Sequence, residues 1–237
     1  FHAGVRQRTK VCAYGCEPAT RNEDLRTAQR RVLGLPADAR VLLAVGVCDL
    51  NKAFDAAIRA LPAVAARGQL VIVGDGPERA SLTLLADRLG VSRRVHLVGA
   101  QRDMAPWYAA ADAVISTSFY DTFPNALLEG MMYGRPVVVP RHAPPHVYAG
   151  LAEVVREGGG LLYDRCQSGS LAEVLNELLS RPHLAAELGQ QAGALARQRF
   201  RWEHCLDVIC GPPAERAADG VSLPRRVPSP SEHVYAS

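Results

Sequence analysis

The chain has 237 residues, of which 48% are hydrophobic and 22% are charged, and its formal net charge at pH 7 is +3. This length suits one α/β domain with appended segments, and the apolar content suffices for a buried core. Lysine and arginine are scattered rather than gathered into a basic stripe, which argues against a nucleic-acid partner. No apolar run reaches the roughly 18 residues that a membrane span needs, and the N-terminus has no signal-peptide pattern.

Short apolar runs alternate with helical patterns along most of the chain. A charged helix is predicted at 22–34, and buried strands are predicted at 41–45, 70–73, 95–98, 113–115, 136–139 and 161–163. Helices are expected between and after the strands, at 54–65, 77–89, 104–111, 125–132, 170–180, 184–199 and 202–209. This alternation predicts the α/β class with a doubly wound parallel sheet, a Rossmann-like domain over residues 21–210.

The two ends of the chain differ from this domain. Residues 9–18 predict a short strand followed by a turn rich in glycine and proline. Residues 211–237 are dominated by proline, arginine, serine and alanine without a period, and we expect this tail to be disordered.

The six cysteines do not form a metal-binding pattern. Cys12-x3-Cys16 and Cys205-x4-Cys210 have spacings that zinc sites do not use, and no histidine pattern supports them. We therefore expect no metal site and free, mostly buried thiols in a reducing compartment.

The stretch from Ser116 to Gly134 carries the candidate site. It predicts a strand end, a polar loop with Asp121, and a helix whose first backbone N–H groups, at Asn125 and Ala126, offer an anion site. Glu129 follows Asp121 by eight positions, so the two carboxylates occupy different levels of one crevice. Open α/β sheets bind ligands at this carboxyl edge, and a nucleotide-sugar fits the pattern, with phosphates at the helix and hydroxyls at the acids.

The same stretch carries a resemblance. Residues 121–138, DTFPNALLEGMMYGRPVV, are similar to the nucleotide-sugar signature of retaining GT-B glycosyltransferases, the group 1 transferases of family 4. That signature is Glu-x7-Glu followed by Met-x-x-Gly-x-Pro-Val-Val; Asp121 stands in place of the first Glu, and Glu129 matches the second. Further segments match in order, over roughly residues 9–210: LAVG at 43–46, Lys52, IVGDGP at 72–77, VHLVG at 95–99, Tyr108-x3-Asp112, Glu153, GLL at 160–162 and Phe200-x-Trp202.

The resemblance assigns contacts with a nucleotide-diphosphate sugar to particular residues. They are Gly46 and Lys52 at the diphosphate, Gly99 and Ala100 at the nucleobase edge, Glu129 at the ribose hydroxyls, the backbone of Asn125 and Ala126 at the distal phosphate, and Asp121, as the catalytic residue, at the hydroxyls of the transferred sugar. No cofactor or metal is implied, because a lysine and a helix terminus supply the positive charge and the chain lacks an Asp-x-Asp pair.

Two further positions depart from the family's pattern. An arginine usually follows the glycine at position 46, and a glycine usually follows the lysine at position 52, whereas this chain has Val47 and Ala53. The missing arginine removes a charge-assisted contact worth about 1.5–3 kcal/mol.

The resemblance implies the donor-binding half of a GT-B enzyme, a retaining glycosyltransferase of the hexosyltransferase type. Residues 1–20 would be the inter-domain segment. An N-terminal domain, in cis or in trans, would carry the pocket for an unknown acceptor, and the chain alone would be inactive. The expected location is the cytoplasm, free or peripheral to a membrane.

Two other classes of function stay open at this point. The first is a non-catalytic nucleotide-sugar-binding or scaffold module that supports a partner transferase, as Val47 and Ala53 suggest. The second is another GT-B-type enzyme, a sugar-nucleotide epimerase or a phosphorylase, although the catalytic acids and histidine of the epimerases have no counterpart here.

Overall fold

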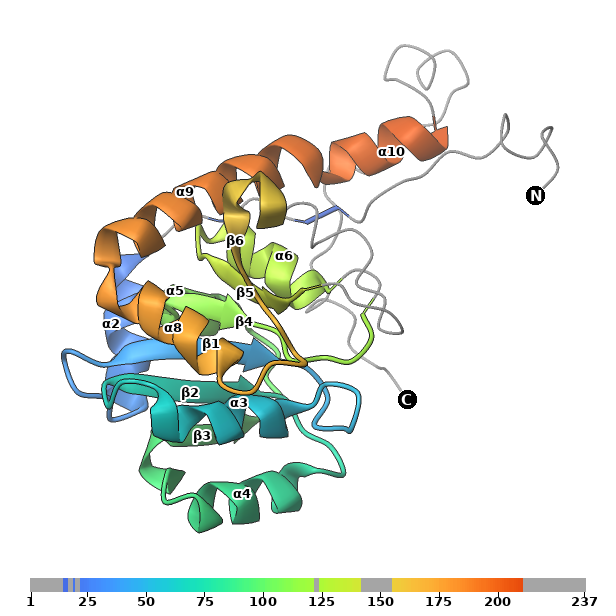
Figure 1. Cartoon of the computed structure of the whole chain (residues 1–237). Coiled ribbons are helices and arrows are strands. Elements are labelled where there is room, and N and C mark those ends of the chain that lie inside the picture. Colours follow the sequence, from blue (N-terminus) through green and yellow to red (C-terminus); the bar gives the residue numbers. More distant parts are fainter. Residues whose placement is uncertain (1–14, 17–18, 20–21, 122–123, 142–154, 211–237) are drawn as a thin grey trace, which may run out of the picture.

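The sheet of this protein has six parallel strands. A computed structural model describes residues 15–16, 19, 22–121, 124–141 and 155–210 (Figure 1). The strands are β1 (Arg40–Val45), β2 (Gly68–Val73), β3 (Val95–Gly99), β4 (Ala113–Ile115), β5 (Val137–Pro140) and β6 (Gly160–Tyr163). Their order in the sheet is β3-β2-β1-β4-β5-β6. From β1 the chain adds strands first on one side, β2 and β3, and then on the other side, β4 to β6, while all neighbouring pairs stay parallel. The predicted doubly wound, Rossmann-like sheet is confirmed, and its switch point lies between the two central strands, β1 and β4.

Helices cover both faces of the sheet (Figure 1). They are α2 (Glu23–Val32), α3 (Phe54–Ala60), α4 (Arg79–Arg88), α5 (Ala105–Ala110), α6 (Asn125–Met132), α8 (Ser170–Ser180), α9 (Pro182–Arg199) and α10 (Trp202–Cys210). Alternate residues of β1 belong to different cores: Leu42 packs with apolar side chains of α3, α4 and α8, and Leu43 packs with those of α5, α6 and α9. This two-sided burial explains why the strands read as continuous apolar runs.

The helix expected at 54–65 is shorter than predicted. It ends at Ala60 and continues as a 3-10 turn, Leu61–Ala63. The cause is Pro62, which has no N–H to donate to a carbonyl one turn earlier. A further short helical turn at Val155–Gly159, absent from the prediction, precedes β6.

The expectation of mostly buried thiols is wrong for the cysteines whose exposure the structure gives. Cys48 and Cys166 are free, as expected, but Cys48 alone of the four is buried, since Cys16 and Cys205 are partly exposed and Cys166 is exposed. The predicted strand near the N-terminus falls almost wholly, and the predicted disordered tail wholly, outside the described residues. Among the helices of the described ranges, none has the length and apolar character to cross a membrane.

Asp112, which belongs to the Tyr108-x3-Asp112 motif, ties α2 to the sheet. Its carboxylate pairs with Arg26 at 2.6 Å and Arg30 at 3.3 Å, and it accepts the backbone N–H of Val41 at 2.7 Å. Asp112 precedes β4 and Val41 lies near the start of β1, so this cluster lies at the amino edge of the sheet. Its role is to anchor the fold, away from the ligand-binding edge.

Candidate functional site

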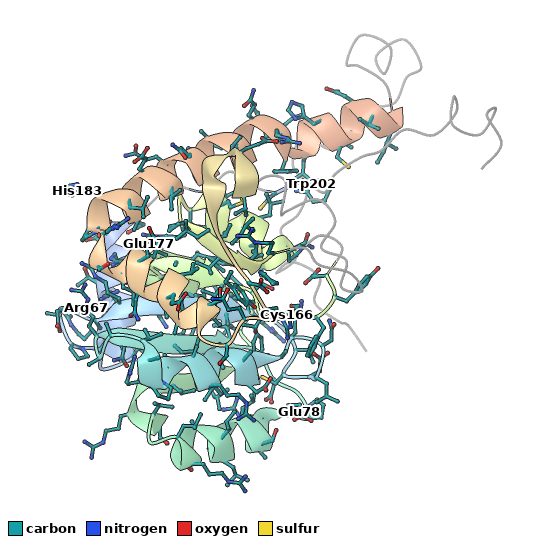
Figure 2. The ribbon with its side chains drawn as sticks, viewed as in Figure 1. Arg67, Glu78, Cys166, Glu177, His183 and Trp202 are labelled. Atoms are coloured by element: carbon teal, nitrogen blue, oxygen red, sulfur yellow. The ribbon has the colours of Figure 1, made fainter. Side chains whose placement is uncertain are left out.

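A pocket of about 280 Å³ opens at the carboxyl ends of β1 and β4, where the strand order reverses. It is lined from the β1 side by residues 45, 46, 52 and 54, from the β4 side by residues 114–116, 118 and 121, and by residues 124–127 at the start of α6. In Figure 2, Glu78 and Cys166 mark this carboxyl edge of the sheet, and Arg67 and His183 mark the opposite edge. The pocket therefore occupies the place where doubly wound sheets bind their ligands.

Glycines let the backbone after β1 and β2 pack closely beneath the pocket. A Cβ on Gly74 would lie 1.8 Å from the carbonyl oxygen of Gly46, and a Cβ on Gly46 would lie 2.8 Å from Cε of Lys52. Both glycines have positive φ, 147° for Gly74 and 151° for Gly46. The aliphatic stem of Lys52 thus lies over Gly46, and this contact directs the ammonium toward the pocket.

Lys52 and Asp121 form an ion pair in the pocket wall. Nζ of Lys52 lies 2.7 Å from Oδ2 of Asp121, and the two side chains are 25% and 14% exposed. The lysine is held at its own loop as well, since its backbone N–H donates to Oδ1 of Asp49 at 2.7 Å. A phosphate entering the pocket would meet a cation whose charge is already partly balanced by the aspartate.

The start of α6 supplies the second anion-binding feature. The N–H groups of Leu127 and Leu128 both donate to the carbonyl of Pro124, at 3.0 and 3.3 Å. The N–H groups of Asn125 and Ala126 come before these first intrahelical bonds, and both residues line the pocket. Buried Leu127 and Leu128 fix the helix against the sheet, so these two amides are held in place for an anion.

Five of the eight predicted site residues thus meet in one pocket. They are Gly46, Lys52, Asp121, Asn125 and Ala126. Glu129, Gly99 and Ala100 are not among the described residues that line it.

Glu129 lies one turn into α6 and is half-buried beside two stacked tyrosines. Burial of the Tyr108 hydroxyl, together with the nearby Glu129 carboxylate, raises the pKa of Tyr108 well above its ordinary value. Burial, with Asp103 and Glu129 adding to it, also raises the pKa of Tyr133, whose ring lies 5.4 Å from that of Tyr108. The carboxylate of Glu129 therefore lies on the side of α6 that faces Tyr108 of α5. The assignment of Glu129 to the ribose stays a prediction.

Gly99 and Ala100 lie at the same carboxyl edge but two strands away from β1. The carbonyl of Gly99 accepts the N–H of Gly74 at 2.9 Å, and Ala100 is exposed. Two strand spacings amount to about 10 Å. An extended ligand would be needed to reach both Ala100 and the pocket, and the nucleobase assignment stays a prediction too.

Sequence reasoning missed residues that hold the loop after β4. Asn51 pairs with the backbone of Tyr120, and the guanidinium of Arg165 donates to the carbonyls of Thr117 and Ser118. Asn51 could have been noticed because it precedes Lys52. Arg165 comes from the segment after β6, and no local sequence signal connects it with this loop.

The backbone at Ala53 shows why the family has a glycine at this position. This residue has φ 48° and ψ 44°, in the left-handed region that glycine adopts without strain. Alanine keeps the turn but at a steric cost. Val47, which replaces the usual arginine, is 54% exposed.

Among the described residues, no group of three or more histidine, cysteine, aspartate or glutamate side chains is placed to hold a metal ion.

Comparisons with known proteins agree with this geometry. The model of the family "Glycosyl transferases group 1" matches residues 39–181. The chain is 33% identical over 182 residues to the lipopolysaccharide core biosynthesis glycosyltransferase LpsE of Rhizobium meliloti, covering 75% of this chain and 51% of that protein. It is 37% identical over 193 residues to the D-inositol 3-phosphate glycosyltransferase of Thermobispora bispora, covering 75% of this chain and 43% of the relative. The chain thus spans about half the length of the curated relatives it matches.

A solved structure shows the same architecture. The crystal structure of Anabaena Alr3699/HepE in complex with UDP superimposes with a TM-score of 0.78 and 26% identity, covering 90% of this chain and 58% of that one. The fold is that of one half of a GT-B glycosyltransferase. The match of the family model to more than half of the chain, on this fold, shows that the protein belongs to the glycosyl transferases group 1.

Proposed function

We propose that this chain binds a nucleoside-diphosphate sugar and is the donor-binding part of a retaining glycosyltransferase of the hexosyltransferase type. The observation that carries the proposal is the convergence of Lys52 and the amino end of α6 on one pocket at the switch point of the sheet. A lysine and free amide N–H groups can bind phosphate together without a metal. The crystal structures of Alr3699/HepE with UDP and with UDP-glucose support this choice of ligand.

Within this proposal the roles divide between charge and hydrogen bonding. Lys52 holds the diphosphate, and the amides of Asn125 and Ala126 hold the distal phosphate, where the charge of the leaving group develops. Asp121 exchanges its lysine partner for the hydroxyls of the transferred sugar when the phosphates arrive, and Glu129 binds the ribose.

Transfer requires a second domain that carries the acceptor. Chemistry between two bound molecules depends on holding the reacting atoms about 3–3.5 Å apart in a site closed to water. A single donor domain supplies one wall of such a site. The acceptor domain, in cis or in trans, supplies the other, so the chain alone binds donor without transferring sugar.

The test is a titration of UDP, GDP, ADP and their sugars into the chain by isothermal calorimetry. We expect one nucleoside diphosphate to bind, and we expect Glu129→Gln to weaken it by roughly ten- to 150-fold, the equivalent of a charged hydrogen bond of about 1.5–3 kcal/mol. Unchanged affinity in that variant would remove Glu129 from the site. No binding of any member of the panel would overturn the proposal.

A non-catalytic scaffold is the second candidate, and the Lys52–Asp121 ion pair favours it, because a paired lysine attracts phosphate less than a free one. The two candidates are separated by adding the N-terminal domain and measuring product. Transfer with retained anomeric configuration supports the enzyme. Donor binding without transfer in the two-domain form supports the scaffold.

A further inference from the structure

Asn51 joins two loops beside the pocket. Its side-chain N–H donates to the carbonyl of Tyr120 at 3.0 Å, and its side-chain oxygen accepts the N–H of the same residue at 3.1 Å. Its backbone carbonyl accepts the N–H of Phe119 at 2.7 Å. One amide side chain therefore satisfies both backbone groups of Tyr120, as a neighbouring strand would. The loop after β4 is bound in this way to the loop after β1.

These hydrogen bonds stand next to the ion pair. Asn51 directly precedes Lys52, and Tyr120 directly precedes Asp121. Another hydrogen bond joins the same two loops, because Oγ1 of Thr117 donates to the carbonyl of Lys52 at 2.8 Å. Consecutive Cα atoms are about 3.8 Å apart along a rigid peptide link, so a shift of Tyr120 displaces Asp121 with it.

The beginning of the loop after β4 has a separate anchor. The guanidinium of Arg165 donates to the carbonyls of Thr117 and Ser118, and its central carbon lies 3.8 Å from the ring centroid of Phe119. This anchor does not extend to Tyr120. In the ranges that the structure describes, the hydrogen bonds found for Tyr120 both come from Asn51.

We propose that Asn51 is a positioning residue, whose amide clamps Tyr120 and thereby sets the separation of Lys52 and Asp121. Two charged side chains on separate loops bind a ligand well only when their backbones are held in register. The effect of the clamp on donor binding rests on the proposed function. The clamp itself does not, and it is testable without a ligand.

The chain offers a matched control at Asn176, on α8. Its side-chain oxygen accepts the N–H of Ala65 at 2.8 Å, and its side-chain N–H donates to the carbonyl of Ala63 at 2.8 Å. This amide makes the same two-point contact with backbone groups, in an exposed place that is not part of the pocket. Asn176→Ala removes equivalent hydrogen bonds without touching the loops of the site.

The first measurement uses the full 237-residue chain without ligand. The shift in urea midpoint caused by Asp121→Asn is compared in the unchanged, Asn51→Ala and Asn176→Ala backgrounds. Asn51 makes its side-chain bonds at an exposed position, so its alanine variant is expected to fold, which circular dichroism verifies. We expect the shift to fall by more than half in the Asn51→Ala background and to persist with Asn176→Ala. A full shift in all three backgrounds would overturn the clamp.

The second measurement is calorimetric binding of UDP and uridine. Asn51→Ala should lower the affinity for UDP by about three- to tenfold, the range expected when a positioned charged contact is partly lost. It should change the affinity for uridine by less than about twofold. In a Lys52→Ala background the same substitution should add less than about twofold, because the lysine that it positions is gone. Equal losses for UDP and uridine would overturn the link to the ion pair. If the panel shows that the chain binds GDP or ADP instead of UDP, the same comparison is made with that diphosphate and its nucleoside. If the unchanged chain binds no member of the panel, the proposed function fails, and the urea measurement alone decides the clamp.

Discussion

Replacing Asp121 by asparagine should strengthen the binding of UDP. The carboxylate balances the charge of Lys52 at 2.7 Å, and it repels any phosphate that approaches the same ammonium. Asparagine keeps the shape of the side chain and removes the charge. The diphosphate then meets a lysine whose charge is not balanced.

The size of the gain follows from the geometry of the pair. A phosphate oxygen that accepts another N–H of the Lys52 ammonium would lie about 4.5 Å from the carboxylate, because two N–H bonds of a tetrahedral nitrogen diverge by about 109° and each hydrogen bond spans about 2.8 Å. Two unit charges at that separation repel each other with about 0.9 kcal/mol in water and about 3.7 kcal/mol at an effective dielectric constant of about 20. Side chains that are 14% and 25% exposed lie between these limits. Loss of the lysine's anchor offsets part of the gain, so we expect UDP to bind about fivefold more tightly.

The assay is calorimetry with UDP and uridine, with Asp55→Asn as the control. Asp55 is a 49% exposed partner of Arg59 on α3, so its neutralisation changes the net charge equally without touching the pocket. UDP affinity should change by less than about twofold in that variant, and uridine affinity should not change in either. Weaker UDP binding by Asp121→Asn, or an equal gain for uridine, would refute the proposed competition between carboxylate and phosphate. In the two-domain form the variant should lose turnover, because asparagine cannot accept hydrogen bonds from sugar hydroxyls as a carboxylate does.

Three further predictions concern stability. Ala53→Gly should leave the free energy of unfolding in urea nearly unchanged, because relief of about 1–2 kcal/mol of left-handed strain offsets the lost methyl burial and the added entropy of the unfolded chain. The control Ala57→Gly, inside α3, should lower it by about 1.5–2 kcal/mol. Equal losses in the two variants would refute the strain at Ala53. Burial lowers the pKa of His96 from its ordinary value of 6.5, so the folded state binds this proton only at a lower pH than the unfolded state, and the free energy of unfolding falls as the pH drops below 6.5. His96→Asn should therefore lose less stability than the unchanged chain between about pH 7 and pH 5. An identical pH dependence in the two proteins would contradict this. Gly74→Ala should destabilise more than Gly34→Ala, because the new Cβ at Gly74 meets a carbonyl oxygen at 1.8 Å while the one at Gly34 meets nothing within 4 Å; comparison of the two denaturation midpoints tests this.

The fold could be predicted from the sequence because burial on both faces leaves a direct record in it. In β2 all six residues are buried, and the apolar run at 70–73 reveals the strand, although the strand itself begins two residues earlier, with Gly68 and Gln69. Helix ends were less predictable. The periodic pattern of α3 continues to Val64, and only the missing N–H of Pro62 changes the helix into a 3-10 turn.

Five residues of the pocket could be predicted from the sequence, but the contacts between residues of separate loops could not. Lys52 and Asp121 were assigned to one ligand through the family resemblance, yet their direct pairing across 69 positions has no signal in the sequence. It depends on β1 and β4 being neighbours, which follows from the reversal of strand order rather than from any local pattern. The same holds for Asn51 with Tyr120, and for Arg165, which reaches the loop after β4 from beyond β6.

The replacement of the family's arginine by Val47 changes the charge of the pocket. With Val47 in place of an arginine, the charged side chains that line the pocket within the described residues are Lys52 and Asp121, and they are paired. The charge available to an incoming diphosphate therefore depends on the lysine exchanging its carboxylate partner for a phosphate, and on the fixed amides at the start of α6. In the proposed donor complex, such an exchange would leave the carboxylate unpaired as the hydroxyl groups of a sugar enter beside it. Hydroxyls are the donors that a displaced carboxylate needs, so binding of the phosphate prepares the group that would hold the sugar.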